Sequence, residues 1–168
     1  SLEAFEQCFN VTIDQPRDLS VLASVARDNS SINLQLNGSN KYYIMVNNNT
    51  IVTDQSDYKL NLSKGLNVIR ITGDKECQGV YEETIFNSED ILLSPNPAVN
   101  NTNLWVGGND TNVNLSIFDN SGRLLWTRTK ELNSGRDINI ETTNLKAGMY
   151  YIKVESETVR KTAKLIKK

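Results

Sequence analysis

Few residues of this chain have the types and spacing that catalysis requires. The 168 residues include no histidine, so the side chain that most often acts as general base near neutral pH is absent. The same absence removes a common zinc ligand, and two cysteines cannot complete a thiolate zinc site on their own. These observations argue against most hydrolytic and metal-dependent mechanisms.

Paired carboxylates remain open to a chain without histidine, because two of them suffice for glycoside hydrolysis. Glu82 and Glu83 are adjacent in a predicted strand and therefore point to opposite faces of a sheet. Asp54 and Asp57 flank a turn, and Asp119 begins an Asp-Asn-Ser-Gly turn that its side chain can cap. That turn also resembles part of a calcium loop, but the twelfth-position ligand is missing. We therefore predict no enzyme, no metal site and no cofactor.

The elements that carry these residues are predicted to be short antiparallel strands. Helical periodicity is absent, whereas apolar and polar residues alternate at short intervals, which is typical of half-buried strands. Turn formers such as Asn37-Gly38 and Asn47-Asn48-Asn49 separate the runs. In the first half we predict seven strands, with inward residues Phe9/Val11/Ile13, Leu19/Val21/Ala23/Val25, Ile32/Leu34/Leu36, Tyr42/Ile44/Val46 and Tyr58/Leu60/Leu62, and runs over 66–71 and 80–86.

The second half repeats this organisation. Seven further strands are predicted at 91–93, 104–106, 113–118, 124–129, 138–140, 149–154 and 158–166. The fold class is therefore all-β, with two tandem immunoglobulin-like sandwiches. We place the domains at 1–87 and 88–168, and a linker this short allows the two sandwiches to touch.

The net charge differs between the two halves of the chain. Residues 1–90 carry 7 basic and 13 acidic side chains (net −6), and residues 91–168 carry 11 and 7 (net +4). Such an imbalance can direct binding, although it usually only keeps a surface soluble. No run of about 18 apolar residues is present, so no transmembrane segment is predicted. No nucleic-acid partner is predicted either.

The last part of the chain contains motifs in a specific order. Pro95-Asn96-Pro97-Ala98 follows an apolar run, residues 113–119 lead to Gly122-Arg123, and Gly148-Met149-Tyr150 precedes a terminal basic strand. This order over roughly 91–168 resembles the C-terminal sorting domain of type IX secretion cargo. The first half resembles the immunoglobulin-like stalk modules that often precede such domains.

The resemblance implies partners and a location. Cargo of this family reaches the periplasm by the general secretory route, and a shuttle receptor and the type IX outer-membrane translocon carry it out of the cell. For some cargo, a sortase removes the domain and joins the new end to anionic lipopolysaccharide, whereas other cargo is released. We therefore expect a secreted or cell-surface product of a Gram-negative bacterium. Because Ser1 is not an initiator methionine, we expect the chain to be part of a longer protein.

The matching positions have distinct expected roles. Pro95 and Pro97 fix φ and lack a backbone donor, so Pro95 to Ala98 is expected to form a rigid turn that cannot pair further and faces a receptor. Gly122 and Gly148 supply positive φ, and with Tyr150 they determine the fold. The expected recognition residues are Pro95, Asn96, Pro97, Ala98, Arg123, Lys153, Lys164, Leu165, Ile166, Lys167 and Lys168.

Two further expectations follow from export. Proteolysis needs an accessible extended segment, so the sortase is expected to cut within Asn87, Ser88, Glu89 and Asp90, which we predict to be exposed. An oxidising compartment favours disulfides, so we expect Cys8, on the first strand, to pair with Cys77, just before the last strand of the first sandwich.

The alternative function is a carbohydrate-binding or adhesin fragment of a surface protein. Trp105 and Trp126 are the candidate platforms, because exposed indole rings stack on sugars. Each lies in an apolar strand context, in which packing is the commoner role. Asn-x-Ser/Thr sequences such as Asn10, Asn48 and Asn61 are expected by chance in an asparagine-rich chain, so glycosylation is not favoured.

Overall fold

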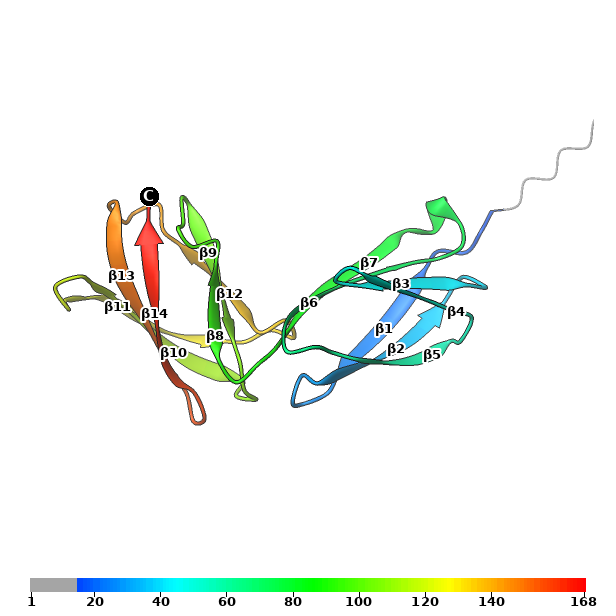
Figure 1. Cartoon of the computed structure of the whole chain (residues 1–168), viewed down its shortest axis with the longest axis horizontal. Helices are drawn as coiled ribbons and strands as arrows, with labels where there is room; N and C mark the ends of the chain where they lie inside the picture. Colours follow the sequence, from blue (N-terminus) through cyan, green and yellow to red (C-terminus); the bar gives the residue numbers. More distant parts are fainter. Residues whose placement is uncertain (1–14) are drawn as a thin grey trace, which may run out of the picture.

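The computed structural model describes residues 15–168, and these residues form fourteen β-strands and one short 3-10 helix. The predicted all-β class is confirmed. Figure 1 shows two sandwiches that follow one another along the chain. The first contains β1 (Ser20–Val25), β2 (Ser31–Asn37), β3 (Tyr42–Val46), β4 (Asn49–Thr53), β5 (Asp57–Asn61), β6 (Gly65–Thr72), η1 (Glu76–Gln78) and β7 (Val80–Asn87). The second contains β8 (Ile91–Ser94), β9 (Asn101–Val106), β10 (Asn112–Asp119), β11 (Leu124–Glu131), β12 (Asp137–Glu141), β13 (Gly148–Glu155) and β14 (Arg160–Lys167).

Both sandwiches have the same topology. In the first, β1-β2-β5 forms a three-stranded sheet and β4-β3-β6-β7 a four-stranded sheet. In the second, β8-β9-β12 and β11-β10-β13-β14 repeat that order seven strands later. All strand pairs within the sheets are antiparallel. The immunoglobulin-like tandem arrangement that the sequence predicts is therefore present.

Alternation of side chains explains why these segments form strands. On β2, Ile32, Leu34 and Leu36 are buried, while the residues between them are exposed. On β10, Val113 and Leu115 are buried in the same way. Successive residues of a strand point to opposite faces, so this pattern fits a sheet with one face on a core and the other in solvent.

Each sandwich encloses its own core. The first cluster of buried apolar side chains consists of residues between Ile32 and Ile85. The second cluster consists of residues between Leu93 and Leu165. A fully buried aliphatic side chain contributes about 1.5–3 kcal/mol by leaving water, so each core can stabilise its own domain. Two separate cores support our proposed division at residues 87 and 88.

The strand set of the first sandwich differs from the prediction in one place. The sequence pattern predicts no strand between Val46 and Tyr58, but β4 occupies Asn49–Thr53 there. β4 lies at the edge of its sheet, and within this strand only Ile51 packs against the first core. An edge strand therefore needs no regular apolar alternation, which explains the omission. The predicted strand at Phe9 to Ile13 lies outside the described residues.

The turn between β3 and β4 follows from asparagine chemistry. Val46 pairs with Asn49, so only Asn47 and Asn48 form the loop. Asn47 has a φ of 53°, a left-handed conformation that asparagine adopts more readily than most residues. The predicted turn is present.

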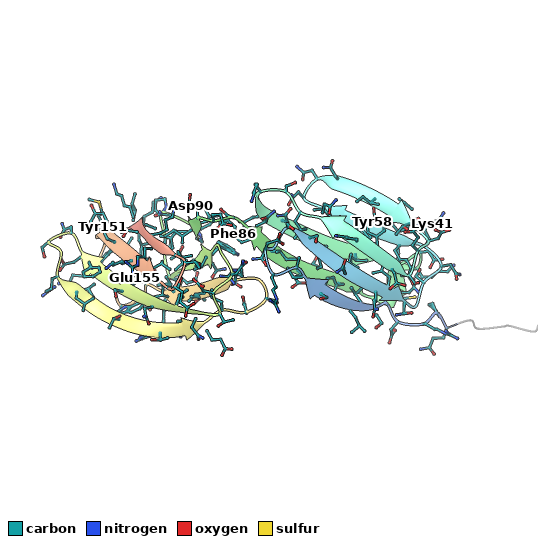
Figure 2. The ribbon with its side chains drawn as sticks, turned by 90° about the horizontal axis from the view of Figure 1, so that it is seen from below. Lys41, Tyr58, Phe86, Asp90, Tyr151 and Glu155 are labelled. Carbon is teal, nitrogen blue, oxygen red and sulfur yellow. The ribbon has the colours of Figure 1, made fainter. Side chains whose placement is uncertain are left out.

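The linker between the sandwiches is held by hydrogen bonds to the second sandwich. Gly107 N–H donates to the Asp90 carbonyl at 2.8 Å, and Gly108 N–H donates to the Ser88 carbonyl at 3.0 Å. The Asp90 carboxylate also contacts Lys161 Nζ at 2.7 Å. Figure 2 shows Asp90 and Phe86 near the junction of the two sandwiches.

The predicted exposure of the whole linker is wrong for Asn87. This residue ends β7 and is only 4% exposed, because its side-chain Nδ2 donates to the Leu62 carbonyl at 3.0 Å. Glu89 and Asp90 are exposed as predicted, and Ser88 is half-buried. The accessible part of the linker is therefore shorter than the sequence suggested.

The two sandwiches also touch beyond the linker. Ser134 Oγ, in the loop before β12, donates to the Glu83 carboxylate on β7 at 3.4 Å. A Cβ atom on Gly135 would lie 2.9 Å from the Thr84 carbonyl oxygen, so the loop approaches β7 closely. The short linker and this contact together restrict the junction.

Candidate functional site

The segment Pro95 to Ala98 runs beside the end of β14. Ala98 forms an isolated parallel bridge with Lys167. The Ala98 N–H donates to the Ile166 carbonyl at 2.8 Å, and the Lys168 N–H donates to the Ala98 carbonyl at 2.9 Å. Two motifs that lie about seventy residues apart in the sequence are thus joined by backbone hydrogen bonds.

Asn96 extends this pairing with its side chain. Its Nδ2 donates to the Lys164 carbonyl at 2.7 Å, and its Oδ1 accepts from the Ile166 N–H at 2.9 Å. A primary amide offers one donor and one acceptor side, as a peptide group does. The asparagine therefore takes the place of a neighbouring strand at the edge of β14.

The expectation that Pro95 to Ala98 cannot pair further is therefore wrong. Pro95 and Pro97 lack a backbone donor, as expected. The donors instead come from the Asn96 side chain and the Ala98 backbone. We call residues 95–98, together with their hydrogen bonds to β14, the strand clamp.

A residue that no sequence motif indicates anchors the strand clamp. Thr102 on β9 is fully buried, and its Oγ1 donates to the Pro95 carbonyl at 2.8 Å. Ala98 is also fully buried and belongs to the second core. A methyl side chain suits this position because the backbone lies directly against the core. Residues Asn100 to Asn103 are all polar, so no apolar alternation indicates that Thr102 points into the sandwich.

The end of β14 exposes alternate side chains. Leu165 is fully buried and Ala163 is partly buried, whereas Lys164 is exposed and Ile166 is 40% exposed. Lys168 is exposed and Lys167 is partly exposed. Leu165 is thus a core residue, and Lys164, Ile166 and Lys168 are the members of this strand that a partner could contact.

An apolar surface continues from Ile166 across the sheet. Ile166 pairs with Met149, and Lys164 pairs with Tyr151. Tyr151 in turn pairs with Phe118 on β10. Tyr151 is 38% exposed, and its outward position on β13 can be followed in Figure 2. Exposed apolar area rimmed by lysines is typical of an interaction surface.

The structure brings most of the selected motif residues to one end of the second sandwich. Asp119 pairs with Tyr150, Tyr150 pairs with Leu165, and Gly148 pairs with Lys167. The tip of the β10–β11 hairpin, the start of β13 and the end of β14 therefore lie together, opposite the linker. Lys153 lies farther along β13 and forms an ion pair with Glu155 at 2.9 Å.

Arg123 belongs to an aspartate-centred turn at this end. The Asp119 carboxylate accepts hydrogen bonds from Ser121 Oγ at 2.6 Å and from the Arg123 N–H and Nε, each at 3.0 Å. These bonds, that of Ser121 most strongly, lower the pKa of Asp119 to about 2. Gly122 has a φ of 82°, and a Cβ there would meet nothing within 4 Å, so backbone conformation rather than space favours glycine.

Gly148 and Tyr150 have structural positions. Gly148 begins β13 with a φ of 156°. Tyr150 is buried, and its hydroxyl donates to the Lys146 carbonyl at 2.8 Å. These contacts stabilise the loop before β13.

The predicted disulfide is not supported. Cys77 is exposed on η1, just before β7. Cys8 lies outside the described residues, so its pairing with Cys77 stays a prediction.

The two tryptophans do not share a surface. Trp105 on β9 pairs with Leu92 and Asp137 in the three-stranded sheet. Trp126 lies on β11, at the edge of the other sheet, with the Arg128 guanidinium 5.0 Å from its ring centroid. Both rings are half-buried. The two candidate platforms are therefore separate, half-buried rings, and sugar binding stays an alternative prediction.

The carboxylates selected earlier are separated as well. Glu82 contacts Arg70, whereas Glu83 accepts a hydrogen bond from the Tyr81 hydroxyl. Burial and this carboxylate raise the pKa of Tyr81 well above its ordinary value. Residues 15–168 contain no group of three or more His, Cys, Asp or Glu side chains that could hold a metal ion. Nor does this part of the chain contain a helix long and apolar enough to cross a membrane.

The fold and the site define a class of protein: an all-β module whose exposed strand end is suited to binding. Residues 93–168 match the family model described as a secretion system C-terminal sorting domain. The resemblance inferred from the sequence is thereby confirmed. A domain of this kind is a C-terminal sorting signal of the type IX secretion system, and it implies a secreted or cell-surface protein.

Solved structures add little beyond this. A chain described as the BSP domain of a biofilm associated protein has a TM-score of 0.36 at 13% identity over 89% of this chain, which spans only 29% of that chain. The alpha chain of the chicken interferon gamma receptor has a TM-score of 0.31 at 8% identity over 92% of this chain and 100% of its own. Scores this low carry no argument about function. A search of curated proteins finds no match.

Proposed function

We propose that residues 88–168 direct the attached protein through the periplasm and across the outer membrane by the type IX translocon. The shuttle receptor binds the end of the second sandwich at which the strand clamp meets β14. The observation that carries this proposal is the set of hydrogen bonds joining Asn96 and Ala98 to residues 164–168. They combine two separate motifs into one surface.

The expected recognition residues fall into two groups, exposed side chains that can contact a receptor and residues that position the strand. Lys164, Ile166, Lys168, Pro95 and Pro97 are exposed and can contact the receptor. The buried Ala98 and Leu165, and Asn96 through its hydrogen bonds, position the strand instead. Arg123, at the same end, is a further contact, whereas Lys153 lies farther from the strand clamp.

Export of a reporter tests this function. Residues 88–168 are fused behind a signal peptide and a fluorescent protein and expressed in a bacterium with a type IX system. We expect translocon-dependent appearance of the reporter on the surface or in the medium. A folded fusion that stays in the periplasm would contradict the proposal.

Removal of residues 166–168 tests the recognition surface. The deletion takes away the Ile166 and Lys168 partners of the strand clamp, so export should be lost while the first sandwich stays folded. The double variant K164E/K168E keeps the backbone contacts and should reduce export in a folded domain. Normal secretion of both variants would exclude this surface.

We further propose that a sortase cuts the linker and joins the product to lipopolysaccharide. The exposed Glu89 is the accessible centre of the segment, but the bonds from Gly107 and Gly108 hold both sides of it. Cleavage therefore requires local release of the linker from the second sandwich. Mass spectrometry of the mature surface protein would show whether its new end lies within residues 87–90.

The first sandwich is a stalk in this proposal. It has its own core and no selected catalytic group, and it spaces the preceding part of the protein from the sorting domain. A Cys8–Cys77 bridge would stabilise it. Thiol labelling of the unreduced secreted protein should modify neither cysteine, and labelling of both would exclude the bridge.

A further inference from the structure

The two edges of the four-stranded sheet in the second sandwich differ. At one edge, Asn96 and Ala98 cap the end of β14. At the other edge, β11 pairs with β10, and no second strand pairs with it in the described part of the chain. An edge of this kind can accept a strand from another polypeptide.

A groove lies beside the open edge. It has a volume of about 560 Å³ and is bounded by β11 and β12. Its lining includes Leu115, Ile138 and Ile140, which are 0%, 7% and 3% exposed. The groove thus reaches side chains of the second core, and it can receive an apolar side chain from a strand that lies along β11.

Charge indicates what kind of strand would fit. Arg128 and Lys130 line the groove from β11 and are exposed. The opposite wall carries one carboxylate, Glu141, which already accepts a hydrogen bond from Thr143 Oγ1 at 2.8 Å. The β11 side is therefore cationic, and acidic side chains complement it.

We propose that β11 and this groove bind an extended segment of a partner protein by β-strand addition. In the bound strand, one face places apolar side chains in the groove. Acidic side chains on the segment pair with Arg128 and Lys130. The site lies at the edge opposite the strand clamp, so it does not depend on the proposed receptor contact.

A random 12-residue peptide library displayed on phage tests the site, with the full chain immobilised through its N-terminus. We expect enrichment of sequences that combine alternating apolar residues with Asp or Glu. An enriched peptide is then synthesised and titrated. The R128E/K130E double variant should weaken its binding by about tenfold or more, whereas K41E/K59E, an equal charge change on exposed positions of the first sandwich, should not.

Two measurements separate strand addition from other modes. N-methylation of alternate peptide residues should abolish binding for one set of positions and spare the other, because only every second amide of an added strand faces β11. In a W105F background Trp126 is the only tryptophan, and its fluorescence should change on binding.

Either of two results would overturn the proposal. One is the absence of any enriched alternating sequence. The other is enriched peptides whose affinity is unchanged both by R128E/K130E and by N-methylation of either set of positions.

Discussion

Asn96 links two parts of the second sandwich through one side chain. Its amide makes two hydrogen bonds with β14, and a typical intramolecular bond contributes about 0.5–1.5 kcal/mol. We expect Asn96→Ala to destabilise the second sandwich by about 1–3 kcal/mol and to speed exchange of the Ile166 amide. Denaturant unfolding and hydrogen exchange measure both effects.

The matched control is Asn101→Ala, an exposed asparagine on β9. It should change stability by no more than about 0.5 kcal/mol. Unchanged protection of the Ile166 amide in Asn96→Ala would contradict the bridging role of this side chain.

Asp119 makes the hairpin at the same end sensitive to acid. Its pKa falls from an ordinary 3.8 to about 2 in the folded protein, chiefly through the bond from Ser121 Oγ. Because the folded pKa is lower than the unfolded one, the stabilisation is complete above about pH 4 and is lost as pH falls toward 2. We expect D119N to be less stable than the parent at pH 7, with the difference vanishing near pH 2 in unfolding curves recorded across this range.

The conformation of the linker depends on a glycine. A Cβ on Gly107 would lie 2.2 Å from the Ser88 carbonyl oxygen and 2.7 Å from that of Asp90. Gly107→Ala should therefore push the linker away and increase cutting at Glu89 by a glutamate-specific protease. Lys161→Ala removes only an exposed ion pair with Asp90, worth about 0–1 kcal/mol, and should change cutting little. Equal cutting of the parent and Gly107→Ala would show that the linker is already free.

Most elements could be predicted from the sequence, and the failures have physical causes. Strands with one buried face, such as β2 and β10, show clear alternation. β4 does not, because this edge strand packs only Ile51 against the first core. The residues of the candidate site were chosen from sequence motifs, and their role in recognition stays a prediction. The strand clamp was not predictable, because the side-chain amide of Asn96 takes the place of a neighbouring strand there. Hydrophobic periodicity does not indicate such a contact.

The two separate cores should give two separable unfolding events. Both tryptophans lie in the second sandwich, so their fluorescence reports that domain alone. Leu115→Ala should lower its stability by about 2–5 kcal/mol, because Leu115 is fully buried. Leu34→Ala in the first core should leave the fluorescence transition nearly unchanged. Equal shifts in both variants would mean that the domains unfold as one unit.

The strand clamp also has a consequence for the order of folding. Its partners lie up to 70 residues apart, and contacts of such separation form late because the intervening chain must first be ordered. The complete recognition surface should therefore exist only after the second sandwich has folded. Under the proposed function, a receptor that reads this surface accepts only chains whose second sandwich has folded, so the sorting signal also serves as a quality check on that domain.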